Sequence, residues 1–131
     1  MITARLIIEI AGFPKEHIES VMKGVMEQIK ASNDVLSYDI YEAKEVEQMW
    51  STFTEMEINF KELKDLIAFC FDKMPSSIEI VEPENLHIKG KDLEDLLNDL
   101  MSKLHEYDAE VKRLRLDNLA FKNKSWTFFS T

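Results

Sequence analysis

A heptad pattern of large side chains near the end of the chain constrains the fold more than any other feature. These side chains follow one another at spacings of four and three residues: Leu93, Leu97, Leu100, Leu104, Tyr107, Val111, Leu114, Asn118 and Phe121. Such a pattern predicts a helix over residues 92–122 that pairs with another helix along one narrow seam. At 1.5 Å per residue this helix would be roughly 45 Å long, which is longer than a small domain is wide.

The charges beside the seam favour pairing between two parallel copies of the helix. With Leu97 at heptad position a, the g and e positions of two parallel helices bring together side chains of opposite charge: Lys103 with Asp108, Glu110 with Arg115, and Asp117 with Lys122. Asn118 falls at an a position, where one polar residue specifies register and a two-stranded state. An antiparallel pair stays open as an alternative, because residues 92–111 are mainly acidic and residues 112–124 mainly basic.

A second interpretation is that the helix packs on its own domain. Leu96 and Met101 support it for the first half, because they widen the apolar stripe to the width of a helix that covers a core. The second half keeps only the narrow seam. We therefore expect at least the second half to pair between chains, and we expect these interface residues: Leu97, Leu100, Leu104, Tyr107, Val111, Leu114, Asn118 and Phe121.

The residues before the long helix alternate between strand and helix patterns. Apolar residues at every second position predict four strands, at 3–10, 35–43, 52–60 and 78–81. Apolar residues at helical spacing predict two helices, at 14–31 and 60–74. This order resembles the ferredoxin-like βαββαβ arrangement, in which a four-stranded antiparallel sheet carries two helices on one face.

The expected fold class is therefore α+β. It consists of a ferredoxin-like domain at 1–91, a coiled-coil helix at 92–122 and an aromatic tail at 123–131. We expect the sheet order 4-1-3-2, with the strands numbered along the chain. The expected core residues are Ile8, Ile10, Val25, Ile58, Leu66, Ile67, Phe71 and Ile80.

The composition is that of an acidic, folded protein of the cytoplasm. A net charge of −9 argues against nucleic acid as a partner, because phosphate binding needs clustered lysine and arginine. Cys70 is the single cysteine, so a disulfide framework is excluded and a reducing compartment is expected. The apolar first residues include Arg5 and Glu9, and no stretch of membrane length follows. We expect neither a signal peptide nor a membrane-spanning helix.

No residue pattern predicts a catalytic, metal or cofactor site. His17, His87 and His105 belong to three different segments and show no metal-ligand spacing with Cys70. With three glycines in the chain, a glycine-rich phosphate loop is not expected. Cys70 lies on the apolar stripe of its predicted helix, which indicates a buried, unreactive thiol. We therefore expect no enzyme activity and no cofactor.

The sheet face away from the helices is where such domains often bind ligands. Alternation predicts that it carries Arg5, Ile7, Glu9, Phe53, Glu55, Glu57, Glu79 and Val81. RNA-recognition modules need several stacked aromatic side chains and basic residues on this face. Here it carries one aromatic side chain and four glutamates, so RNA binding is not expected. A solvated or dimer-covered face is expected, and a divalent cation held by glutamates is the alternative.

The final residues carry an aromatic cluster, formed by Trp126, Phe128 and Phe129. Exposed aromatic clusters usually mark interfaces, so we expect this tail to contact the second copy or another protein. The leading functional hypothesis is a non-catalytic interaction or scaffold protein that homodimerises through its C-terminal helix. The alternative is a regulatory domain that senses a small molecule at a sheet or dimer seam.

Overall fold

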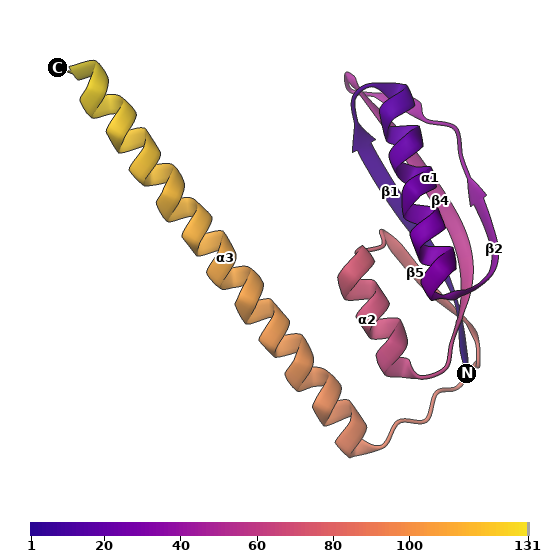
Figure 1. Cartoon of the computed structure of the whole chain (residues 1–131). Coiled ribbons are helices and arrows are strands. Elements are labelled where there is room, and N and C mark those ends of the chain that lie inside the picture. Colours follow the sequence, from indigo (N-terminus) through magenta and orange to yellow (C-terminus); the bar gives the residue numbers. More distant parts are fainter. Residues whose placement is uncertain (131) are drawn as a thin grey trace. The chain divides into compact units, whose positions relative to one another are not determined.

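The computed structural model describes the backbone of residues 1–130 and the side chains of residues 1–122. The chain forms two compact units, Met1–Leu86 and His87–Thr131. The first unit contains all strands and two helices, and the second contains one long helix. The elements are β1 (Ile2–Gly12), α1 (Lys15–Ser32), β2 (Asp34–Ile40), β3 (Lys44–Val46), β4 (Met49–Phe60), α2 (Leu63–Lys73), β5 (Ser77–Glu82) and α3 (Gly90–Ser130) (Figure 1).

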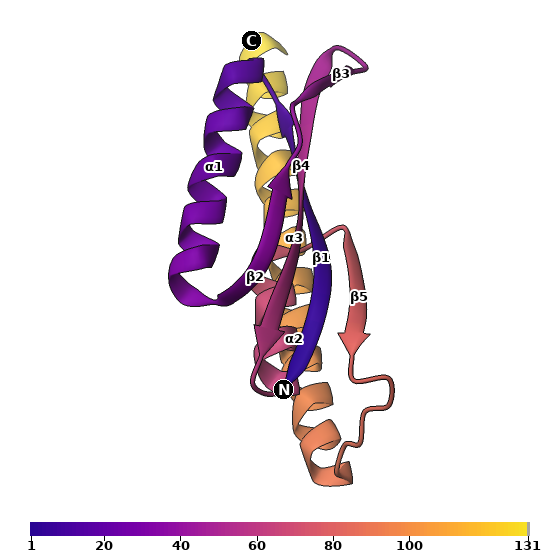
Figure 2. The ribbon, with the colours of Figure 1, turned by 90° about the vertical axis from the view of Figure 1, so that its right-hand side faces the viewer.

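The first unit has the expected α+β class, with an antiparallel sheet and two helices. The sheet order is β2-β4-β1-β5, and β3 pairs with the beginning of β4 (Figure 2). The two central strands, β1 and β4, pair over their whole length, from Ile2 opposite Phe60 to Gly12 opposite Trp50. Because β5 and β2 lie at the two edges, most of the core side chains come from the central strands.

The sheet has five strands, where the sequence analysis expects four. The additional strand is β3, which lies in the charged segment between the predicted strands at 35–43 and 52–60. Val46 pairs with Met49 across a two-residue turn, in which Glu47 and Gln48 have φ angles of 48° and 69°. Positive φ at both central positions is the conformation of a type I′ hairpin turn, for which Asn-Gly is the usual sequence. The hairpin is missed from the sequence because Glu-Gln is not a turn signal.

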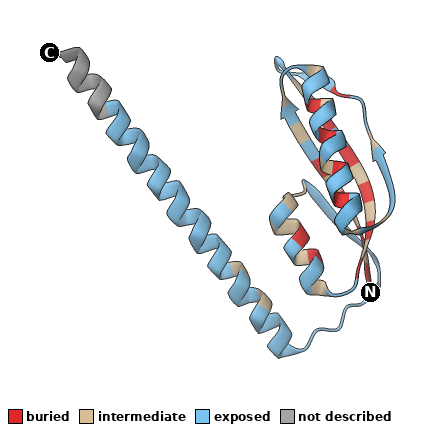
Figure 3. Ribbon diagram, viewed as in Figure 1, coloured by how far each residue is buried: buried red, intermediate tan, exposed pale blue. Residues whose placement is uncertain are grey.

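The core lies between one face of the sheet and the helices α1 and α2 (Figure 3). Residues at every second position of β1 and β4 point into it, as the alternation predicts. The buried cluster consists of Ile2, Ala4, Leu6, Ile8, Met22, Met26, Ile29, Met56, Ile58, Phe60, Leu66 and Phe69. Phe60 and Phe69 meet edge to face, with ring centroids 5.6 Å apart. The expected core residues Ile8, Ile58 and Leu66 are confirmed.

Part of the predicted core is wrong, and the errors fall together around α2 and β5. Ile80 is 42% exposed, while Ile67 and Phe71 are half-buried. The reason is the orientation of α2, which packs over β1 and β4 and turns Phe69 toward the core. The edge strand β5 is therefore not covered by α2. Ile10 and Val25 are half-buried and pack against the margin of the core.

The second unit contains the helix α3, which has 41 residues. At 1.5 Å per residue it is roughly 60 Å long. It includes the predicted helix at 92–122 and begins two residues earlier, at Gly90. The predicted aromatic tail at 123–131, with Trp126, Phe128 and Phe129, lies outside the residues whose side chains are described.

Candidate functional site

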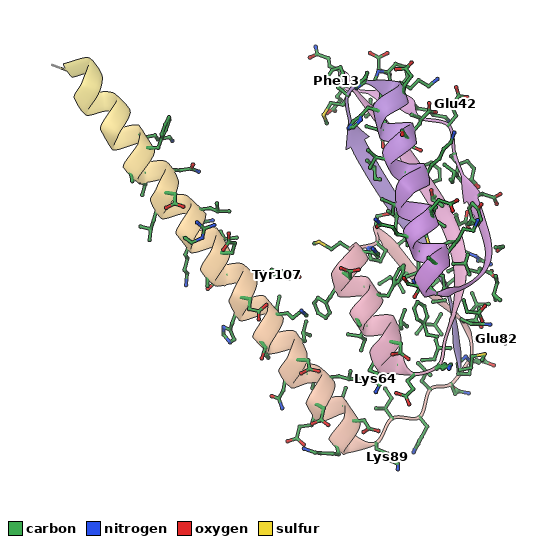
Figure 4. The ribbon with its side chains drawn as sticks, in the orientation of Figure 1. Phe13, Glu42, Lys64, Glu82, Lys89 and Tyr107 are labelled. Atoms are coloured by element: carbon green, nitrogen blue, oxygen red, sulfur yellow. The ribbon has the colours of Figure 1, made fainter. Side chains whose placement is uncertain are left out.

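The apolar seam of α3 is the candidate interaction surface. Every large apolar a or d side chain between Leu97 and Phe121 is exposed by 45% to 71% of its surface, except Leu100, which is half-buried. Asn118 is also exposed. Figure 4 shows Tyr107, a d-position residue, on the middle part of the helix. A single helix cannot bury its own apolar stripe, so this seam has no partner among the described residues of the second unit.

The acidic residues beside the seam form ion pairs within the same helix. Asp108 accepts a hydrogen bond from Lys112 at 2.9 Å, which holds the pKa of Asp108 below its ordinary value. Arg113 pairs with Asp117 at 3.0 Å and also with Glu110, whose pKa it lowers. These are i,i+3 and i,i+4 pairs, which stabilise a helix by about 0.2–0.5 kcal/mol each.

These intrahelical pairs change the expected electrostatics of a helix dimer. The sequence analysis pairs the same acids with Lys103, Arg115 and Lys122 of another chain. Because each acid already has a cation on its own helix, an additional interchain partner adds less than it would to a free carboxylate. In such a dimer, the apolar seam would have to supply most of the association energy.

Two leucines of α3 lie outside the seam, and the sequence analysis does not single them out. Leu116 is 67% exposed and Leu119 is exposed as well. They occupy the f and b positions, on the side of the helix opposite the a and d residues. Continuing the heptad lettering to these residues would have identified them. They provide matched controls for substitutions in the seam.

The open face of the sheet in the first unit is a second candidate surface. The register of β1, β4 and β5 places seven of the eight predicted residues on one face, with Arg5 opposite both Glu57 and Glu79. The eighth, Val81, lies at an irregularity in the pairing of β1 with β5. Arg5 forms ion pairs with Glu57 at 2.8 Å, Glu79 at 3.1 Å and Glu55 at 3.5 Å. The hydrogen bond to Glu57 and the charge of Glu79 raise the pKa of Arg5, so the guanidinium stays protonated.

This arrangement turns the acidic face into a charge-compensated cluster. One arginine offsets part of the charge of three glutamates. The alternative of a divalent cation held by glutamates would require these carboxylates to give up their ion pairs with Arg5. Among the described residues, no group of three or more His, Cys, Asp and Glu side chains could hold a metal ion. Phe53 stacks on Tyr41 with ring centroids 4.4 Å apart, a neighbour that the sequence analysis does not identify.

Replacing Arg5 with methionine should lower the melting temperature by a few degrees at low salt. The substitution keeps the apolar stem but leaves three adjacent carboxylates without their cation, so they repel one another. In 1 M salt the loss in melting temperature should be smaller, because the screening length falls to about 3 Å. Thermal unfolding followed by circular dichroism measures both effects. Lys64→Met is the control, since Lys64 is highly exposed and, among the described residues, forms an ion pair with Glu62 only. Equal melting temperatures for the two variants would contradict the prediction.

Cys70 on α2 lies outside the seam and the open sheet face. Cys70 is half-buried on α2, and burial raises the pKa of its thiol, which lowers the fraction of reactive thiolate. Across the part of the chain that the structure describes, no helix combines the length and apolar character needed to cross a bilayer.

The fold and the candidate surfaces define a class of protein: an α+β domain followed by a long amphipathic helix with an uncovered seam. The chain belongs to the MJ0538 family, whose model matches residues 3–129. It is similar to the "Uncharacterized protein MJ0538" of Methanocaldococcus jannaschii, with 30% identity over 100 residues. That match covers 74% of this chain, and the chain spans only 38% of the length of the relative. No solved structure matches the chain.

Proposed function

We propose that the protein is a non-catalytic interaction protein that forms a homodimer through the a and d positions of α3. The observation that supports this function is the uncovered seam between Leu97 and Phe121. Fully burying one large apolar side chain contributes about 1.5–3 kcal/mol. Partial burial of successive leucines against a second copy is therefore a sufficient driving force for association.

Asn118 favours a parallel orientation of the two helices. In a parallel pair it lies opposite the same asparagine of the second chain, and the two side-chain amides can hydrogen-bond to each other. In an antiparallel pair it would face an apolar d residue and leave a buried amide unpaired, at a cost of about 1–3 kcal/mol. The first half of the helix is mainly acidic and the second half mainly basic, which favours the antiparallel pair. This attraction acts between exposed charges, however, and salt screens it.

Light scattering of the full chain over a concentration series tests the dimer, which should be the main species at micromolar concentration. Orientation is tested in a Cys70→Ser background that carries either Leu97→Cys or Asn118→Cys. Each variant alone should form a disulfide between identical positions. Disulfides that form only in a mixture of the two variants would show antiparallel pairing, and a monomer at high concentration would remove the proposal.

The aromatic tail extends the proposed interaction function to a second kind of partner. Trp126, Phe128 and Phe129 would bind another protein, since aromatic side chains are enriched at interfaces. A pull-down with and without residues 123–131 tests this role. Loss of a specific partner on truncation supports it, and unchanged capture contradicts it.

A cavity in the first unit supports the second candidate function, a domain that senses a small molecule. The cavity has a volume of about 800 Å³ and lies between the end of α1 and α2. Phe60 and Phe69 contribute apolar surface, whereas Asp65 and Lys61 contribute charge. The lining combines apolar surface with many polar and charged side chains, and the volume lies in the range of ligand sites. A large and specific thermal shift in a metabolite screen would favour this function over the first.

The proposal also covers the fold family, the location in the cell and the kind of partner. The order of strands and helices in the first unit supports a ferredoxin-like arrangement with β3 as an added strand. The single cysteine supports a reducing, cytoplasmic location. The net charge of −9 supports protein partners over nucleic acid.

A further inference from the structure

The open face of the sheet carries an exposed aromatic pair in addition to the Arg5 cluster. Tyr41, the residue after β2, donates its backbone N–H to the carbonyl of Phe53 on β4 at 3.0 Å, which holds the two residues together. Their rings stack with centroids 4.4 Å apart, yet 40% of Tyr41 and 37% of Phe53 remain exposed. Both residues therefore offer aromatic surface to a partner.

Carboxylates from three neighbouring strands flank this aromatic pair. Glu9 of β1 lies directly opposite Phe53, and Asp39 of β2 lies directly opposite Glu55 of β4 (Figure 2). Glu55 is two residues from Phe53 on the same strand, so the side chains of both point to the open face. We call the set formed by Glu9, Asp39, Tyr41, Phe53 and Glu55 the acidic-aromatic patch.

Asp39 and Glu55 form a pair of like charge. Side chains directly opposite each other in an antiparallel sheet have Cβ atoms about 4.5–5.5 Å apart, and like charges in this position are destabilising. Arg5 relieves the repulsion only in part, because its distance to Glu55, 3.5 Å, is the longest of its three ion pairs. Among the described residues, no lysine or arginine forms an ion pair with Asp39 or with Glu9, which accepts a hydrogen bond from Ser51. A cation supplied by a partner would therefore be stabilised at the patch.

The charge of the whole open face indicates the sign of its partner. The register of the strands places more acidic than basic side chains there: Glu9, Asp39, Glu55, Glu57 and Glu79 against Arg5 and Lys44. The phosphates of a nucleic acid would be repelled by this face, even though its bases could stack on the rings. A basic partner would be attracted, so the charge of the face is complementary to a segment that carries lysine or arginine.

A guanidinium group matches the patch better than an ammonium group. It is planar, it stacks on aromatic rings, and it forms two parallel hydrogen bonds with one carboxylate, whereas an ammonium is a compact and strongly hydrated charge. We propose that the acidic-aromatic patch binds an arginine side chain in a basic segment of a partner protein. The guanidinium stacks on the exposed aromatic surface and donates hydrogen bonds to Asp39 and Glu55. This inference goes beyond the proposed homodimer, because it uses the sheet of the first unit and not the seam of α3.

A binding assay with the full chain tests the patch. The probe is a short fluorescent peptide in which arginine alternates with serine, and the comparison peptide has lysine in place of each arginine. Fluorescence anisotropy should show that the lysine peptide binds at least about threefold more weakly, because lysine lacks the planar fork of donors. The binding of both peptides should weaken as the salt concentration rises. No binding of the arginine peptide at low salt, or equal affinity for the two peptides, would overturn the proposal.

Two matched pairs of variants show where the peptide binds. Asp39→Asn should weaken binding of the arginine peptide about tenfold, because it removes a charge-assisted hydrogen bond. Asp72→Asn makes the same change on α2 and should weaken binding less than about twofold, since an exposed charge outside the site contributes little. Phe53→Leu should also weaken binding, whereas Phe13→Leu, between β1 and α1, should not.

The melting temperature separates a loss of binding from a loss of folding. Asp39→Asn removes the repulsion with Glu55, so its melting temperature should not fall below that of the unchanged protein. Weaker binding in this variant then reports on the patch itself. An equal response of the two variants within either pair would mean that the peptide binds elsewhere, and it would overturn the proposal.

Discussion

Replacing Leu104 with glutamate should convert the protein from a dimer to a monomer at micromolar concentration. Leu104 occupies an a position near the middle of the seam and is exposed in the isolated helix. A glutamate there would bring an unpaired carboxylate into the apolar contact, where an unpaired charge is strongly unfavourable. Together with the lost apolar burial, this should raise the dissociation constant about 100-fold or more, which corresponds to about 2.7 kcal/mol.

The matched control for this substitution is Leu116→Glu on the same helix. It makes the same chemical change, but Leu116 is at an f position, outside the seam. The helix propensities involved are the same, so only the seam distinguishes the two variants. Light scattering and sedimentation should show a dimer for Leu116→Glu and a monomer for Leu104→Glu. An equal response of both variants would mean that association does not use the a and d positions.

Replacing Ile58 with alanine should lower the free energy of unfolding by about 2–5 kcal/mol, the usual cost of removing a large side chain from a packed core. Ile58 is fully buried in β4, between Ala4 of β1 and Val35 of β2. Few atoms are free to move into the space that the substitution leaves. For a small domain, a loss of this size is a large part of the total stability.

Ile88→Ala is the matched isoleucine control, because Ile88 lies in the exposed connection before α3. It should change the free energy of unfolding by less than about 0.5 kcal/mol. Urea unfolding measures both variants, and an unchanged m value would show that the unfolded states are comparable. A loss for Ile58→Ala no larger than that of the control would place Ile58 outside the cooperative core.

The candidate surfaces could be located from the sequence because they depend on short-range periodicity. The seam of α3 follows from spacings of three and four residues, and the open sheet face follows from alternation in β1 and β4. The intrahelical pairs of Arg113 with Glu110 and Asp117 were also readable, since they follow the same helical spacing. They were missed because the acids were assigned to partners in another chain.

The features that could not be predicted depend on residues far apart in the sequence. Whether Ile80 is buried depends on how far α2 reaches across the sheet, and nothing within Ser77–Glu82 contains that information. The ion pairs of Arg5 require β4 and β5 to lie on either side of β1. Stacking of Phe53 on Tyr41 depends in the same way on the pairing of β2 with β4.

The sequence by itself determined where most strands and helices lie, where the final helix begins to within two residues, and which side of that helix is apolar. These properties follow from local hydrophobic patterns, which each segment carries independently of the rest. The tertiary structure alone decided that β3 joins the sheet, that α2 turns Phe69 inward, and that Ile80 on β5 is not buried by the helices of the first unit. Each of these results from packing between distant segments, where one helix can bury only part of the apolar surface available to it.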